Sequence, residues 1–151
     1  KSVFFSRLMM LILTLNTVVL AAQTEVPKAV QTTFKAKFPN AEEIYWDEFD
    51  GQYSAYFYSG DYSVEAYFNQ KGEWLKTSTA IEFEELPTAT QGYITKNFGA
   101  PEYFSNISKV EIPQKIIFAV SFETAINLVD LEFDDSGNLL KKNIEKLEVD
   151  E

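Results

Sequence analysis

The sequence predicts an α+β fold of two tandem repeats, each a helix followed by a four-stranded antiparallel sheet, with the helices packed on one face. Two observations carry this prediction. Residues 52–76 alternate apolar and polar side chains with a period of two, as strands do, and turn clusters interrupt the alternation. A similar helix-and-strand pattern then returns at a nearly constant offset later in the chain.

The first repeat opens with a predicted helix over residues 24–38. Its apolar side chains form one stripe at helical spacing: Val26, Ala29, Val30, Phe34 and Phe38. Thr24 is the expected N-cap, and Pro39 ends the helix. A strand over residues 41–49 follows, and the turn Asp50-Gly51 leads into the alternating stretch.

The alternating stretch predicts three strands separated by turns at residues 59–61 and 69–72. One face is mostly apolar and is expected to form the core: Tyr53, Ala55, Phe57, Val64, Ala66 and Phe68. The other face carries Tyr56, Tyr58, Glu65 and Tyr67, on the side of the sheet that water should contact. Such aromatic residues are enriched at interaction surfaces, but cross-strand tyrosine pairs can also serve only to stabilise a sheet.

The second repeat restarts at Glu84-Glu85-Leu86-Pro87, which is expected to open a helix. Its apolar positions follow those of the first helix at an offset of 60 residues: Leu86, Ala89, Ile94 and Phe98. Strands are expected over residues 103–110 and 115–122, and Val129, Leu131 and Phe133 match the core positions of the first sheet at an offset of 65. The predicted organisation is a signal peptide over 1–22, a first repeat over 23–80 and a second over 81–151, the two repeats forming one compact unit.

The segment 1–22 has the features of a secretory signal peptide. Lys1 and Arg7 are its only charges, an apolar run follows, and Ala21-Ala22 offers small residues for cleavage. The chain has no cysteine, so the fold depends on its hydrophobic core and not on disulfides. We therefore expect a periplasmic or secreted protein, with no membrane insertion after removal of the signal.

The charge balance excludes some partners. The net charge is −10, and removal of residues 1–22 leaves 11 basic and 23 acidic residues, a net charge of −12. Such acidity argues against binding to nucleic acid or to an anionic membrane surface. It is compatible with a basic partner, with divalent cations, or with solubility alone.

The residue types limit the available chemistry. The sequence has no histidine and no cysteine, which removes Ser-His-Asp and Cys-His catalysis and every His or Cys metal site. No glycine-rich phosphate loop occurs, and no spacing singles out a catalytic pair among the many carboxylates. We therefore expect no enzyme and no cofactor.

One short segment offers two further interpretations. Asp135-Ser136-Gly137 has the form of an aspartic-protease triplet, but its position between two strands predicts a hairpin turn. Asp134, Ser136 and Asn138 alternate as at the start of a calcium loop, with Glu145 at the twelfth position. The glycine stands at the fourth position and not at the sixth, which favours a turn over a calcium site.

Several motifs together resemble the PepSY-like family, which is also described as similar to β-lactamase-inhibitor protein. They are residues 38–41 (FPNA), Trp46, residues 68–76 (FNQKGEWLK) and residues 85–87 (ELP), and the resemblance covers nearly all of the chain after residue 22. It implies helices on the convex side of one curved sheet surface, and an exported protein of a Gram-negative bacterium. In the inhibitor, the concave sheet face grips an enzyme; that protein has disulfides, and this chain has none.

These observations predict a non-enzymatic binding module of the bacterial envelope that docks a protein or a peptide. The predicted partner-binding residues are Tyr56, Tyr58, Glu65, Tyr67, Trp46 and Trp74. The alternatives are inhibition of an envelope peptidase or other hydrolase, a carboxylate enzyme or cation-binding protein, and self-assembly in which the tyrosine-bearing face forms a homodimer interface.

Overall fold

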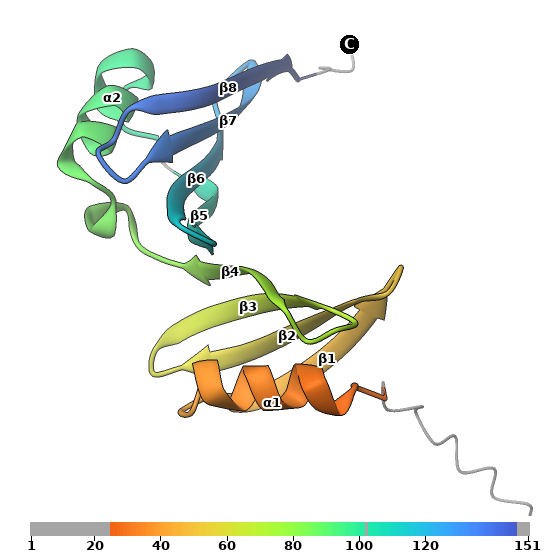
Figure 1. The fold of residues 1–151 in the computed structure, drawn as a ribbon. Coiled ribbons are helices and arrows are strands. Elements are labelled where there is room, and N and C mark those ends of the chain that lie inside the picture. The colour runs from red at the N-terminus through yellow and green to blue at the C-terminus, as the bar shows by residue number, and fades with distance from the viewer. Residues whose placement is uncertain (1–24, 102, 148–151) are drawn as a thin grey trace, which may run out of the picture.

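The computed structural model of the protein describes residues 25–101 and 103–147. The elements are α1 (Lys28–Lys37), β1 (Glu42–Phe49), β2 (Gln52–Ser59), β3 (Tyr62–Asn69), β4 (Trp74–Ala80), a 3-10 turn η1 (Phe83–Glu85), α2 (Thr88–Phe98), β5 (Phe104–Ile112), β6 (Lys115–Glu123), β7 (Asn127–Asp134) and β8 (Leu139–Lys146). In each half a helix is followed by four strands (Figure 1).

All eight strands form one antiparallel sheet in which spatial order equals sequence order, from β1 at one edge to β8 at the other. The two halves join where β4 pairs with β5, beginning at the pair Thr77–Glu111. Ala66 is paired with Thr77, Thr77 with Glu111 and Glu111 with Ile116, and paired residues share a face. Ala66 lies in the core under α1, and every second residue after Ile116 along β6 lies in the core under α2, so both helices cover the same face of the sheet. We call this side the helix face and the opposite side the open face. The predicted α+β class and antiparallel sheet are confirmed.

The first core lies between α1 and strands β1 to β3. It contains Val26, Val30, Phe34, Ala55, Phe57, Val64, Ala66 and Phe68, all buried. Phe34 is at its centre, with its ring centroid 5.1 Å from that of Phe57 and 5.0 Å from that of Trp46. The apolar face predicted from the period-two pattern is therefore the core face, with Tyr53 half-buried at its margin.

A separate second core lies between α2 and strands β5 to β7. Its buried members are Leu86, Ile94, Val120, Phe122, Val129, Leu131 and Phe133. Aromatic rings also pack against each other in this core. The ring centroid of Phe98 lies 5.2 Å from that of Phe122, and the ring centroid of Tyr93 lies 5.4 Å from that of Phe133. Each helix thus covers the sheet of its own half.

The helix starts differ from the sequence prediction. The first helix begins at Lys28, and Pro27 occupies the N-cap position without a side-chain cap. The predicted cap Thr24 lies outside the described residues, as do the predicted signal peptide over 1–22 and residues 148–151. Residues 83–85 form a 3-10 turn, and the second α-helix begins only at Thr88. In both cases proline precedes the first helical residue, where its missing N–H is no loss.

Hydrogen bonds fix the linker between the halves. The carboxylate of Glu85 accepts a bond from the backbone N–H of Glu82 at 2.8 Å and another from the hydroxyl of Tyr62 at 2.7 Å. These bonds lower the pKa of Glu85, and the bond from the Glu82 backbone contributes more. The β2–β3 hairpin is thereby tied to the segment that leads into α2.

Candidate protein-binding surface

Strand register brings tyrosines together on the open face of the first half. Tyr45 on β1 is paired with Tyr56 on β2, and Tyr56 is paired with Glu65 on β3. Tyr58 follows on β2, with its ring 6.2 Å from that of Tyr56 in an edge-on arrangement. Tyr67 on β3 is paired with Ser54, so it shares this face. We call Tyr45, Tyr56, Tyr58 and Tyr67 the tyrosine patch; the first three are 65%, 43% and 37% exposed.

Tyr67 is the least exposed member of the tyrosine patch. Burial raises the pKa of Tyr67 to about 12, and the neighbouring carboxylate of Glu65 adds to the rise. The phenol therefore remains protonated and neutral throughout the physiological range. The Nζ atom of Lys76 lies 4.0 Å from the ring centroid, within the range of a cation–π contact. These contacts stabilise the ring on the sheet surface.

Trp46 does not belong to this surface. It is paired with Ala55, which is fully buried on the helix face, and its ring packs edge-on against Phe34 at 5.0 Å. The prediction that Trp46 shares a face with the tyrosines is wrong. The indole instead closes the margin of the first core.

Trp74 is also on the helix face, because it is paired with the buried Phe68 after a bulge. Its indole N–H donates to the hydroxyl of Thr77 at 2.9 Å, and the Nζ atom of Lys37 lies 3.7 Å from a ring centroid. The prediction that Trp74 lies with the tyrosines is therefore wrong as well.

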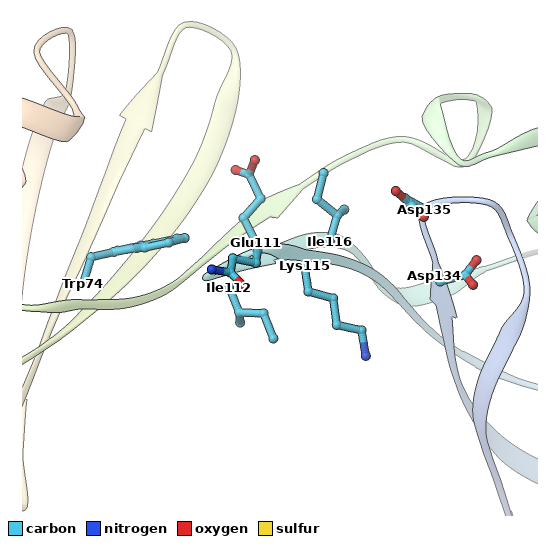
Figure 2. Close-up of a pocket in the computed structure, with 8 residues that line it drawn as sticks. Trp74, Glu111, Ile112, Lys115, Ile116, Asp134 and Asp135 are labelled. Carbon is cyan, nitrogen blue, oxygen red and sulfur yellow. The ribbon is translucent and has the colours of Figure 1, made fainter.

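Trp74 lines a groove of about 580 Å³ where the two halves meet. The other lining residues are Glu111, Ile112, Gln114, Lys115, Ile116, Asp134 and Asp135. Figure 2 shows Trp74 on one side of the groove, the β7–β8 turn on the other and the β5–β6 hairpin between them. The groove is distinct from the tyrosine patch, because Trp74 and the patch project from opposite faces of the sheet.

A smaller hollow of about 180 Å³ adjoins the tyrosine patch at the β1–β2 turn. It is lined by Asp47, Phe49, Asp50, Gln52, Ser54 and Tyr67. Phe49 is 83% exposed, an unusual position for a phenylalanine. Of the residues that line this hollow, the sequence prediction named only Tyr67. It did not name Tyr45 as a member of the tyrosine patch. The open face therefore presents more aromatic surface than the sequence alone suggested.

The segment considered for calcium or catalysis is the β7–β8 turn. The Oδ1 atom of Asp134 accepts bonds from the backbone N–H groups of Ser136 and Asn138, and its Oδ2 atom accepts one from the Asn138 side chain at 2.9 Å. Both carboxylate oxygens are thus used within the turn. In the part of the chain that the structure describes, no group of three or more acidic, histidine or cysteine residues is placed to hold a metal ion.

A pH-dependent contribution to stability is expected from Asp134. The hydrogen bonds from Asn138, first from its side chain and then from its backbone, lower the pKa of this carboxyl. A lowered pKa in the folded state gives stability that is complete above the unfolded pKa of aspartate and is lost as the pH falls through the folded value.

Asp134→Asn should therefore lower the unfolding temperature at neutral pH, and the difference from wild type should disappear in acid. Thermal unfolding of both proteins across a pH series measures this, with Asp135→Asn as the control. A difference that is the same at every pH would contradict the expectation.

A sheet with helices on one face and an uncovered aromatic surface on the other defines an α+β protein with an accessible sheet face. The family model described as "Putative beta-lactamase-inhibitor-like, PepSY-like" matches residues 51–141. That match spans more than half of the sequence, and the chain therefore belongs to the PepSY-like family.

Solved structures from Bacteroides share the fold. A BLIP-like protein from Bacteroides fragilis is 24% identical, with a TM-score of 0.72 over 84% of this chain and 92% of that one. A DUF2874 family protein from Bacteroides ovatus is 26% identical, with a TM-score of 0.72 over 80% and 88%. A structure from Bacteroides eggerthii described as "putative periplasmic proteins" is 21% identical, with a TM-score of 0.72 over 80% and 89%.

A search of curated proteins finds no match to the chain. Among residues 25–101 and 103–147, neither helix is long and apolar enough to cross a membrane.

Proposed function

We propose that this protein is an exported, non-catalytic binding module of the bacterial envelope that docks a protein or a peptide on its tyrosine patch. The observation that carries the proposal is the clustering of four tyrosines on the open face, outside both hydrophobic cores. Tyrosine supplies a large amphipathic contact area with little side-chain entropy to lose on binding. Sheet stability alone does not require four such residues on the face that water contacts.

Other observations support the location and the lack of catalysis. The chain belongs to the PepSY-like family, a related fold is described as periplasmic, and residues 1–22 are predicted to be a signal peptide. The sequence has no histidine and no cysteine. We infer a periplasmic or secreted protein of a Gram-negative bacterium that acts by binding.

The direct test removes two members of the tyrosine patch at once. Tyr56→Ser combined with Tyr67→Ser is expected to abolish capture of the partner from an envelope extract by the immobilised mature protein. Each lost aromatic anchor should weaken binding by roughly 1–2 kcal/mol, which is about five- to thirtyfold in Kd. The captured proteins are compared between wild type and variant by mass spectrometry.

The matched control is Tyr103→Ser combined with Ile126→Ser, which truncates two exposed apolar side chains of the second half. This control is expected to capture the same partner as wild type, and circular dichroism verifies that all variants fold. If the tyrosine variant folds and retains every partner, the patch serves only to stabilise the sheet.

Light scattering measures self-association through this face, and a monomer at micromolar concentration would exclude a homodimer.

Inhibition of an envelope hydrolase is a narrower form of the same proposal, favoured by the family description. It predicts that one enzyme of the envelope loses activity saturably, at equal amounts of enzyme and protein. Activity that falls gradually without saturation would contradict this form and leave the binding proposal intact.

We also infer that the two halves are tandem repeats. Asn69 and Asp134, 65 positions apart, each accept two backbone N–H bonds from the residues two and four positions later. Gly72 and Gly137 then follow with φ of +82° and +83°, and a bulge lies next to both turns. Such detailed agreement between two hairpins supports duplication of one unit. After duplication, only the first copy has tyrosines on its open face.

A further inference from the structure

We propose that the occupant of the tyrosine patch is a lysine- or arginine-rich polypeptide segment, extended along the edge of β1 with alternate side chains reaching over the open face. This inference rests on the proposed function and names the chemistry of the partner. Three observations carry it: the charges of the open face, the composition of the edge strand, and the hollow beside Tyr67.

Carboxylates exceed cations on the open face of the first half. Register places Glu42 opposite Tyr58, Asp47 opposite Ser54, and Glu65 opposite Tyr56. None of these carboxylates takes part in either of the two salt bridges found among the described residues. Lys76 is the only lysine on a strand of this face in the first half, and its ammonium lies over the Tyr67 ring.

The lysines of the first helix lie on the other side of the sheet. Lys28, Lys35 and Lys37 all belong to α1, which covers the helix face (Figure 1). The open face of the first half is therefore electronegative around its aromatic rings. Complementarity of charge across an interface favours a cationic partner and speeds its association.

Strand β1 forms one edge of the sheet, with four carboxylates and no cation in its eight residues. Its ladder with β2 is regular from Tyr45 to Phe49, so the outward backbone groups of this stretch have strand geometry. An edge protected by charge alone would not need exposed aromatic residues, yet Tyr45 is 65% exposed and Phe49 83%. An extended segment added at this edge would bond to the backbone and bring alternate side chains to the open face.

The hollow beside Tyr67 fits the side chain of a lysine or an arginine. Its walls combine two aspartates, Asp47 and Asp50, with the rings of Phe49 and Tyr67. The rings can pack on the aliphatic stem and attract the cation through their π faces, while the carboxylates form charge-assisted hydrogen bonds with it. Asp47 and Asp50 are exposed, and Asp47 accepts a bond from the backbone N–H of Glu48 at 2.8 Å. An acidic side chain in the hollow would add a like charge beside them, and an apolar one would offer them no hydrogen bond.

Calorimetric titration with defined peptides tests the inference. The probes are a peptide of alternating lysine and threonine and its counterpart of alternating glutamate and threonine. The lysine peptide should bind to the mature protein, and the glutamate peptide should not. Asp47→Asn combined with Glu65→Gln should weaken binding about tenfold, as expected when one or two charge-assisted contacts are lost. The control Glu25→Gln with Glu84→Gln removes the same charge away from the sheet strands and should change Kd less than about twofold.

Each outcome separates this inference from the proposed function. Equal binding of the two peptides, no binding of either, or equal weakening by both double variants would overturn the cationic assignment. If the lysine peptide fails to bind but the tyrosine variant still loses a partner that wild type captures, the proposed function stands and only the chemistry assigned to the partner is wrong. If the lysine peptide binds and Tyr56→Ser with Tyr67→Ser leaves its Kd unchanged, the occupant does not use the patch and the inference also fails.

Discussion

Phe34→Ala is expected to lower the free energy of unfolding by about 3–5 kcal/mol, the range for truncating a buried phenylalanine. Phe34 is 2% exposed, and its ring lies within 6.2 Å of four others, those of Phe38, Trp46, Phe57 and Phe68. These neighbours are held by separate strands and a helix, so they cannot collapse fully into the space left by the ring. Urea unfolding followed by tryptophan fluorescence measures the loss, because Trp46 is one of the contacting rings.

Phe49→Ala is the matched control, since it deletes the same atoms from a side chain that is 83% exposed. A change within about 0.5 kcal/mol is expected there, as for most surface substitutions. Equal losses in the two variants would mean that burial in the first core does not determine the effect.

The fold class could be predicted because its signals are local. Alternation with a period of two separates Phe57 and Phe68 from Tyr56 and Tyr67, and the structure places them on opposite faces. The contact between the halves has no such signal. Residues 77–80 pair with residues 108–111, and the two segments are far apart in the sequence. Neither segment has a sequence pattern that identifies the other as its partner. The family resemblance implies one curved sheet surface, but the pairing of β4 with β5 that makes the sheet continuous is seen only in the structure.

The error at Trp46 could have been avoided from the sequence. The two-residue turn Asp50-Gly51 pairs Phe49 with Gln52, and counting back along both strands places Trp46 opposite Ala55. The same count places Tyr45 opposite Tyr56 and so adds it to the patch.

Trp74 was harder to assign. A bulge shifts the register by one residue between the β3 positions Tyr67 and Phe68, and a one-residue shift moves every later side chain to the other face. The glycine in the sequence predicts the turn, but no residue pattern predicts the bulge. The side of the sheet on which Trp74 lies therefore required the structure.

Gly72→Ala is expected to destabilise the protein by about 2–5 kcal/mol, combining strain from the left-handed backbone with overpacking. Gly72 has φ of +82°, which side chains rarely adopt. A Cβ atom there would lie 2.6 Å from the carbonyl carbon and 2.8 Å from the carbonyl oxygen of Ala29 in α1. Backbone cannot move aside as a flexible side chain can, so the helix would have to shift away from the β3–β4 turn. Chemical denaturation gives the loss in free energy.

Two other glycines separate the causes of this effect. Gly60 has φ of +60° but no atom within 4 Å of the position that a Cβ atom would occupy, so Gly60→Ala should show strain alone, about 1–2 kcal/mol. Gly92 lies within α2 with open space around it and no positive φ, so Gly92→Ala should stabilise the protein by roughly 0.5–1 kcal/mol. The expected order is a gain at position 92, a modest loss at 60 and the largest loss at 72. If positions 60 and 72 lost the same free energy, the close approach of α1 to the turn would contribute nothing, and backbone conformation alone would explain why glycine is needed there.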